Sequence, residues 1–126
     1  MLRSVLAIVA GFVTVAVLSI GADAAMHGLG VFPADPARMS DGLFGLATLY
    51  RTVFTGLGGA LTGLLSARTD QRDVRILAGI GFLAGLAGVA AWFATPGLGP
   101  LWYAAAIPVT GAIATLVGGH LAQAVR

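Results

Sequence analysis

Four long runs of apolar residues, separated by short polar or glycine- and proline-rich segments, dominate the pattern of the chain. The runs cover residues 4–22, 43–65, 74–94 and 101–122. Each is close to the ~20 residues that an α-helix needs to cross bilayer hydrocarbon. Each is apolar around the whole helix, unlike a helix on the surface of a water-soluble protein. The sequence therefore predicts an all-α integral membrane four-helix bundle that forms a single domain over residues 1–126.

Composition supports lipid as the main solvent of this chain. Hydrophobic residues make up 58% of its 126 residues and charged residues 10%, whereas a typical soluble domain carries about 25% charge. The mean hydropathy is +0.95. The sequence contains no Cys, Lys or Glu, which excludes disulfides, thiol nucleophiles and thiolate metal sites. No motif implies a cofactor, and the first expected partner is the lipid bilayer.

Arginine placement predicts the orientation. One side of the four-span arrangement receives Arg3, Arg68, Arg72, Arg75 and Arg126, and the other receives only Arg38. Because cytoplasmic loops carry the excess of positive charge, both termini are expected in the cytoplasm. Aromatic residues that suit an interfacial belt fall near the opposite helix ends: Tyr50, Trp92, Trp102 and Tyr103. The basic pI of 9.9 thus reflects topology and does not indicate nucleic-acid binding.

The use of arginine alone as the cation, with abundant Ala and Gly, is typical of a GC-rich bacterial genome. The expected location is therefore the bacterial inner membrane, with several spans. A cleaved signal peptide is the alternative for the first run, because Arg3, an apolar stretch and Ala22-Asp23-Ala24 also fit that pattern. Cleavage would leave three spans. The run is long for a signal peptide, whose apolar region is usually ~7–15 residues, so an uncleaved helix is favoured.

Small residues recur at helical spacing, as close packing between helices in lipid requires. The expected helix-packing residues are Gly59, Gly63, Gly81, Gly85, Gly111 and Gly119. They belong either to contacts within one chain or to the interface of a homo-oligomer. Contacts within the chain explain most of them.

Arg51 is the one charge well inside an apolar run. Such a charge is costly unless it is paired, hydrated or able to reach the interface. At ~1.5 Å per residue, Arg51 lies about 25 Å above Arg68 along the second run, and Asp23 lies about 28 Å from Ser4 along the first. We therefore predict an Asp23–Arg51 ion pair, with Asp41 and Asp35 as second choices. The pair is either a tether that fixes helix register or part of an anion-attracting site; snorkelling to the headgroups is a third possibility.

A polar stripe accompanies Arg51 on the second run. It comprises Thr48, Thr55, Thr62 and Ser66, which share one helix face because their spacing follows the helical repeat. Such a face turns toward protein or a water-filled cavity rather than lipid. The simpler interpretation is that the hydroxyls bond to carbonyls one turn earlier and pack.

Three other residues invite a functional interpretation. His27 follows Asp23 by four residues, which is the spacing of half a metal site or a proton relay, but two ligands do not make a site. His120 is expected at the other side of the membrane, so the two histidines cannot share a site. Pro108 removes a backbone hydrogen bond inside the fourth run, and a static kink is the favoured result.

Several short motifs together resemble those of an uncharacterised group of small four-helix predicted bacterial inner-membrane proteins. They are Tyr50-Arg51, Gly58-Gly59, Gly99-Pro100-Leu101-Trp102-Tyr103 and Gly118-Gly119. The resemblance covers most of the chain and implies the same fold, but it implies no activity.

The sequence favours a structural or partner-binding membrane protein, either an accessory subunit that binds another membrane protein or a homo-oligomer. The alternative is an oligomeric small transporter or channel with an anion-attracting site at Arg51. An enzyme is not expected, because no Ser, His and Asp converge at one depth. A continuous polar cavity lined by Arg51, Thr55, Thr62 and Ser66 would favour transport.

Overall fold

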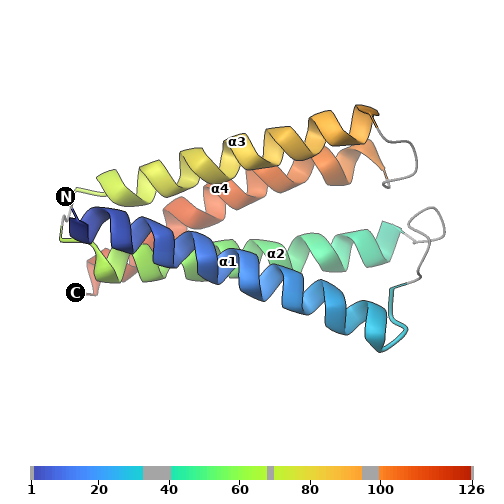
Figure 1. Cartoon of the computed structure of the whole chain (residues 1–126), viewed down its shortest axis with the longest axis horizontal. Coiled ribbons are helices and arrows are strands. Elements are labelled where there is room, and N and C mark those ends of the chain that lie inside the picture. Colours follow the sequence, from blue (N-terminus) through green and yellow to red (C-terminus); the bar gives the residue numbers. More distant parts are fainter. Residues whose placement is uncertain (1, 33–40, 68–69, 95–99, 126) are drawn as a thin grey trace.

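A computed structural model describes residues 2–32, 41–67, 70–94 and 100–125 of the chain. These residues form four α-helices and no strand: α1 (Leu2–Gly28), α2 (Asp41–Leu65), α3 (Arg72–Ala94) and α4 (Leu101–Ala124). Successive helices run in opposite directions, and α1 begins at the end of the molecule where α4 finishes (Figure 1). The predicted all-α four-helix bundle is confirmed.

Each helix contains one of the predicted apolar runs. The largest difference is in α1, which continues through Asp23 and His27 to Gly28. The chain then turns at Gly30, whose φ of 76° is in the left-handed region that glycine adopts at little cost. Asp23 is therefore a helical residue. The helix sets both the height of Asp23 along the bundle and the direction in which its side chain points.

Three of the four described helices, α1, α3 and α4, are long and apolar enough to cross a membrane. Although α2 has 25 residues, it is not among them. Its mean hydropathy is lower because it contains Arg51 and several threonines, the polar residues discussed above. The second predicted span, residues 43–65, thus has the length but not the average apolarity of the others.

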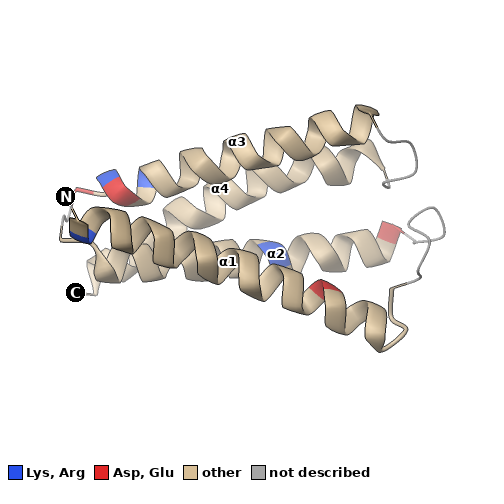
Figure 2. Cartoon of the chain, viewed as in Figure 1, with Lys and Arg blue, Asp and Glu red and all other residues tan. Residues whose placement is uncertain are grey.

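Charged residues gather toward the helix ends, and a broad uncharged zone separates them except for one arginine in α2 (Figure 2). Arg3, Arg72 and Arg75 lie at the end where α1 begins, as expected. The remaining members of the arginine count, Arg38, Arg68 and Arg126, lie outside the described residues, as does Asp35.

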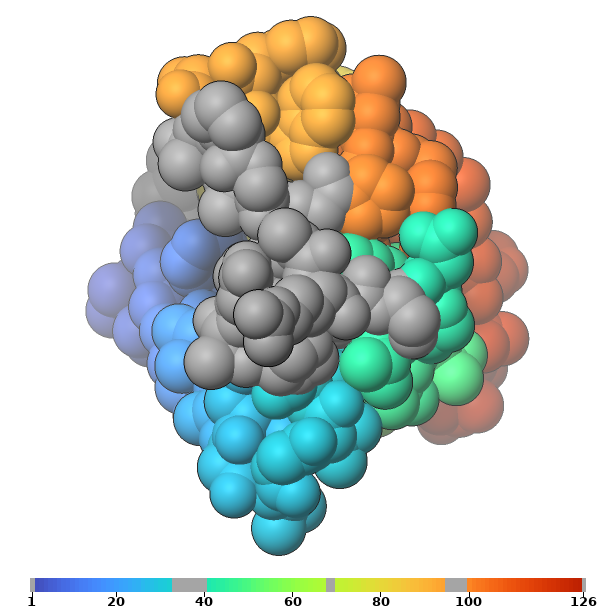
Figure 3. Space-filling view, turned by 90° about the vertical axis from the view of Figure 1, so that its right-hand side faces the viewer, coloured from blue at the N-terminus to red at the C-terminus, as the bar shows by residue number. Residues whose placement is uncertain are grey.

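The helices form a ring that is incomplete on one side. The most extensive contact is between α2 and α4; α1 packs on α2, α3 packs on α4, and contact between α1 and α3 is slight. Seen from one end, α3 and the start of α4 occupy one side of the molecule, while α1 and α2 occupy the other (Figure 3). We call the end that contains Ser4 and Asp73 the closed end, and the end that contains Asp23 and Tyr103 the open end.

Glycines bring α2 and α4 into backbone contact. A Cβ atom added at Gly59 would lie 2.2 Å from the carbonyl oxygen of Thr115, and one at Gly63 would lie 2.9 Å from that of Gly119. Gly119 in turn receives Val74 of α3, whose Cγ1 atom would be 2.3 Å from an added Cβ. These expected packing residues therefore serve contacts within the chain.

The other expected packing glycines differ among themselves. Gly85 admits the ring of Pro108, whose Cβ would lie 2.6 Å from a Cβ at this glycine, and α4 continues through the proline. Gly111 makes only ordinary contact with Thr55, at 3.6 Å. Gly81 corrects the expectation, because a Cβ there would meet nothing within 4 Å. It lies beside a cavity, where no helix packs against it.

Candidate functional site

A polar cluster links three helices near the open end. The Arg51 guanidinium of α2 donates through Nη2 to Asp23 Oδ2 of α1, and the Tyr50 hydroxyl donates to Asp23 Oδ1. The structure thus brings together the ion pair that the sequence analysis expected. The Arg51 and Asp23 side chains retain 29% and 33% of their exposure, so the pair is only partly shielded.

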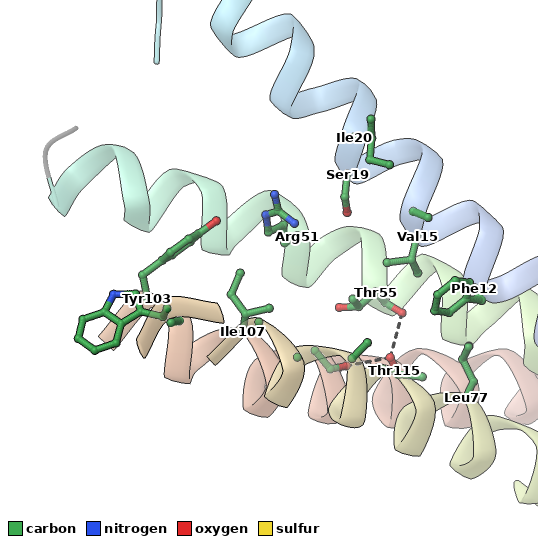
Figure 4. A pocket seen from close by; sticks show the side chains of 18 residues that line it. Phe12, Val15, Ser19, Ile20, Arg51, Thr55, Leu77, Tyr103, Ile107 and Thr115 are labelled. Carbon is green, nitrogen blue, oxygen red and sulfur yellow. Dashed lines mark hydrogen bonds between the residues drawn. The ribbon is translucent and has the colours of Figure 1, made fainter. Parts of the chain in front are cut away.

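Tyr103 brings α4 to the same cluster. Its hydroxyl points toward the Arg51 guanidinium in Figure 4. The Tyr103 ring packs on Phe44 with centroids 4.8 Å apart, which holds the phenol in place. Arg51 Nε is buried, and no described atom accepts its hydrogen. Of the five N–H donors of the guanidinium, the one on Nε is therefore buried without an acceptor among the described residues.

A cavity of about 530 Å³ is lined by residues of all four helices, and it lies where α1 and α3 separate and the ring of helices is incomplete. Trp92 and Tyr103 line it toward the open end, and Phe12 and Leu77 line it farther toward the closed end (Figure 4). Arg51 is on its α2 wall. Most of the lining is aliphatic or aromatic, so the polar cluster forms one local wall of an apolar space.

The first two threonines of the polar stripe bond to carbonyls of the preceding turn of α2, as the simpler interpretation predicts. Thr48 donates to the Phe44 carbonyl at 2.9 Å, and Thr55 donates to the Thr52 carbonyl at 2.8 Å. Thr55 also lines the cavity. Both hydroxyls are thus used within α2, and neither offers a free donor to a ligand.

The remaining members of the stripe hold helices together. Thr62 is fully buried and donates to the Ala7 carbonyl of α1 at 2.8 Å, so its bond crosses to a neighbour and does not turn back on α2. Ser66, also fully buried, donates to Asp73. Neither residue lines the cavity. Within the described chain, the stripe does not form the continuous polar path that transport would favour.

A second polar cluster, at the closed end, was missed from the sequence. Asp73 near the start of α3 is 1% exposed. Its carboxylate accepts hydrogen bonds from Ser66 and Ser4, and Arg72 Nη2 lies 3.4 Å from Oδ1. The sequence analysis treated this segment as a polar turn. The helical rise per residue, which predicted that Asp23 and Arg51 lie at the same height, also predicts similar heights for Ser4, Ser66 and Asp73.

The two histidines lie apart. His27 is exposed in the last turn of α1, with its ring against the edge of Phe32 at 5.6 Å. His120 is exposed near the opposite end of the bundle, on α4. Across residues 2–32, 41–67, 70–94 and 100–125, no group of three or more His, Cys, Asp or Glu could hold a metal ion.

Comparison of the chain with protein-family models, curated proteins and solved structures gave no match. The group that the sequence motifs resemble is therefore an expectation without independent support. The function has to be argued from the geometry.

Proposed function

We propose that this chain is a multi-pass protein of the bacterial inner membrane, with both termini in the cytoplasm. It acts by binding other membrane components, as an accessory subunit or a homo-oligomer, and performs no catalysis. The observation that carries the proposal is the apolar exterior. Large side chains such as Ile20, Leu83, Phe93 and Leu121 are 70%, 67%, 70% and 60% exposed. In water such a surface would drive aggregation, whereas lipid solvates it.

The surface of α2 supports a fourth span despite the lower mean hydropathy of that helix. Its exposed residues include an apolar stripe at helical spacing, formed by Leu49, Val53, Leu57 and Leu64. Its polar groups are turned inward, toward α1 and α4. Because lipid meets only the outward face, α2 can cross a bilayer when its neighbours cover the rest.

The Asp23–Arg51 pair favours a structural role for the one intramembrane arginine. The aspartate neutralises the guanidinium, and the ion pair joins α1 to α2, which are consecutive in the chain. Ser66 donates its hydroxyl hydrogen to the buried Asp73 carboxylate, which joins the end of α2 to the start of α3. The described side chains thus support tethering and packing rather than chemistry.

Extraction and mass measurements test the proposal. Membranes that contain the tagged chain are washed with alkaline carbonate, and the chain is then purified in mild detergent for light scattering and native mass spectrometry. We expect it to resist carbonate and to run either as a defined homo-oligomer or with one stoichiometric membrane partner. Release by carbonate, or a monomer without a partner, would contradict the proposal.

Transport remains the second candidate because Arg51 and Thr55 both line the cavity. An anion-flux assay in vesicles distinguishes it. Transport predicts flux that Arg51→Met abolishes and that the control Arg75→Met, at the closed end, leaves intact. A tether predicts no flux from any of the three proteins.

A further inference from the structure

The cavity between α1 and α3 is long. Its lining residues on α3 run from Leu77 to Trp92, which is about 22 Å along a helix axis. The space therefore extends lengthwise along the bundle, and it is open where α1 and α3 separate.

An extended hydrocarbon chain suits this space. Most of the lining is aliphatic or aromatic, and in the proposed membrane location acyl chains are the apolar groups that surround the bundle.

Small residues on α3 create this space. Gly81, Ala84 and Gly88 lie along the cavity, and a Cβ added at Gly81 or Gly88 would meet no atom within 4 Å. The protein therefore has room there that none of its described side chains uses. An apolar cavity of this kind does not hold water well, and in hydrocarbon the solvent that enters is an acyl chain.

The open end supplies polar recognition next to the apolar cavity. Arg51 Nε is a buried donor without an acceptor in the described chain, on a guanidinium that Asp23 holds in place. Trp92 and Tyr103 line the same end, and such rings favour the headgroup level. The spare donor requires an acceptor oxygen, and a cationic guanidinium strengthens its bond to an oxygen that carries negative charge.

We propose that the cavity between α1 and α3 binds one acyl chain of an anionic phospholipid. The chain lies along Gly81, Ala84 and Gly88, and an oxygen of the lipid's phosphate or ester group accepts the hydrogen of Arg51 Nε. This inference rests on the proposed membrane location, and it makes a bound lipid one of the membrane components that the protein recognises.

Filling the cavity tests the proposal. The variant Gly81→Leu/Gly88→Leu places side chains in the free space, while the control Gly79→Leu adds the same side chain on α3 at a site that is open but not part of the cavity lining. Each full-length protein is reconstituted in vesicles of phosphatidylcholine and phosphatidylglycerol, extracted in mild detergent and analysed by native mass spectrometry. Circular dichroism confirms that each remains helical.

We expect one phosphatidylglycerol per chain on the natural protein and on the Gly79→Leu control. In the filled variant, the amount of retained phosphatidylglycerol should fall at least roughly tenfold, which corresponds to a tenfold weaker dissociation constant. Equal retention by the filled variant and the control would overturn the proposal. So would the absence of retained lipid from the natural protein, or a dimer that only the filled variant loses.

A second arm tests the polar contact. Vesicles that contain diacylglycerol with the same acyl chains offer the hydrocarbon without the phosphate. We expect the natural protein to prefer phosphatidylglycerol and Arg51→Met to lose that preference; equal retention of both lipids by the natural protein would overturn the assigned contact. Flotation with the vesicles separates the two levels of inference. A chain that fails to float contradicts the membrane proposal, whereas a chain that floats without retained lipid contradicts only the lipid site.

Discussion

At the scale of single residues, each buried or half-buried charge is matched by a partner on another helix or at a helix start. Arg51 has Asp23 at the open end, and Asp73 has Ser4 and Ser66 at the closed end. Because an unmatched charge in a low-dielectric environment is costly, these contacts oppose any rotation or sliding of the helices. The two clusters thus act as locks at the two ends of the bundle.

A double-mutant cycle tests the lock at the open end. Arg51→Met and Asp23→Asn should each lower the free energy of unfolding by about 1–3 kcal/mol, between the effects typical of exposed and buried pairs. The double variant should cost no more than the larger single effect, because the second change removes a group already without its partner. Unfolding in mixed micelles measures all four proteins. Strictly additive losses would show that the two residues are not coupled.

The lock at the closed end is tested by Asp73→Ala. The change leaves the buried hydroxyls of Ser4 and Ser66 without their acceptor, and we expect a loss of about 1–3 kcal/mol in unfolding free energy. Asp41→Ala is the control, because Asp41 stands in the first turn of α2 but is exposed. Thermal unfolding in detergent compares them. Equal stability of the two variants would mean that the buried carboxylate contributes nothing to the fold.

At the scale of elements, glycine determines how closely helices approach, and it does so unevenly. Between α2 and α4 the missing side chains allow backbone to touch backbone, as at Gly59. On α3, a Cβ added at Gly79 or Gly81 would meet no atom within 4 Å. Without a hydrophobic force between helices in lipid, van der Waals contact at the close approaches holds the pairs together. One residue type therefore produces both the tightest contact and the cavity.

A matched pair of glycine substitutions separates these roles. Gly59→Ala places a methyl group 2.2 Å from the Thr115 carbonyl oxygen, and we expect the resulting strain to lower the unfolding free energy by about 1–3 kcal/mol. Gly79→Ala meets nothing within 4 Å and should raise it by up to about 1 kcal/mol, because alanine favours helix. Denaturation in mixed micelles gives both values. An unchanged Gly59→Ala protein would refute the close approach of α2 and α4.

At the scale of the whole molecule, α2 explains how a polar sequence fits an apolar bundle. It packs against α1 on one side and α4 on another. Its arginine and the Tyr50 and Thr62 hydroxyls bond to α1, and the Thr48 and Thr55 hydroxyls bond within α2 itself. Its outward stripe remains apolar. The helix that is least apolar on average is thus the one with the most extensive packing in the bundle.

Cysteine labelling tests whether α2 crosses the membrane. The chain has no natural cysteine, so Asp41→Cys and Ala67→Cys, at the two ends of α2, each create one thiol at an exposed position. A membrane-impermeant maleimide applied to spheroplasts should label Asp41→Cys directly and Ala67→Cys only after permeabilisation. Labelling of both from the same side would mean that α2 does not cross.

The sequence by itself determined the number, type and approximate limits of the helices, because run length and apolar character are local properties. It also placed Asp23 beside Arg51, since the fixed rise of a helix sets the level of each residue. Only the tertiary structure decided which helices are neighbours, that Asp73 is buried and that Gly81 faces a cavity. The physical reason is that α1, α3 and α4 are apolar all round, so no polar stripe tells which face turns inward. The inward face of each helix depends on how side chains interlock between helices. The height of a residue along a helix axis does not specify the rotation of the helix about that axis.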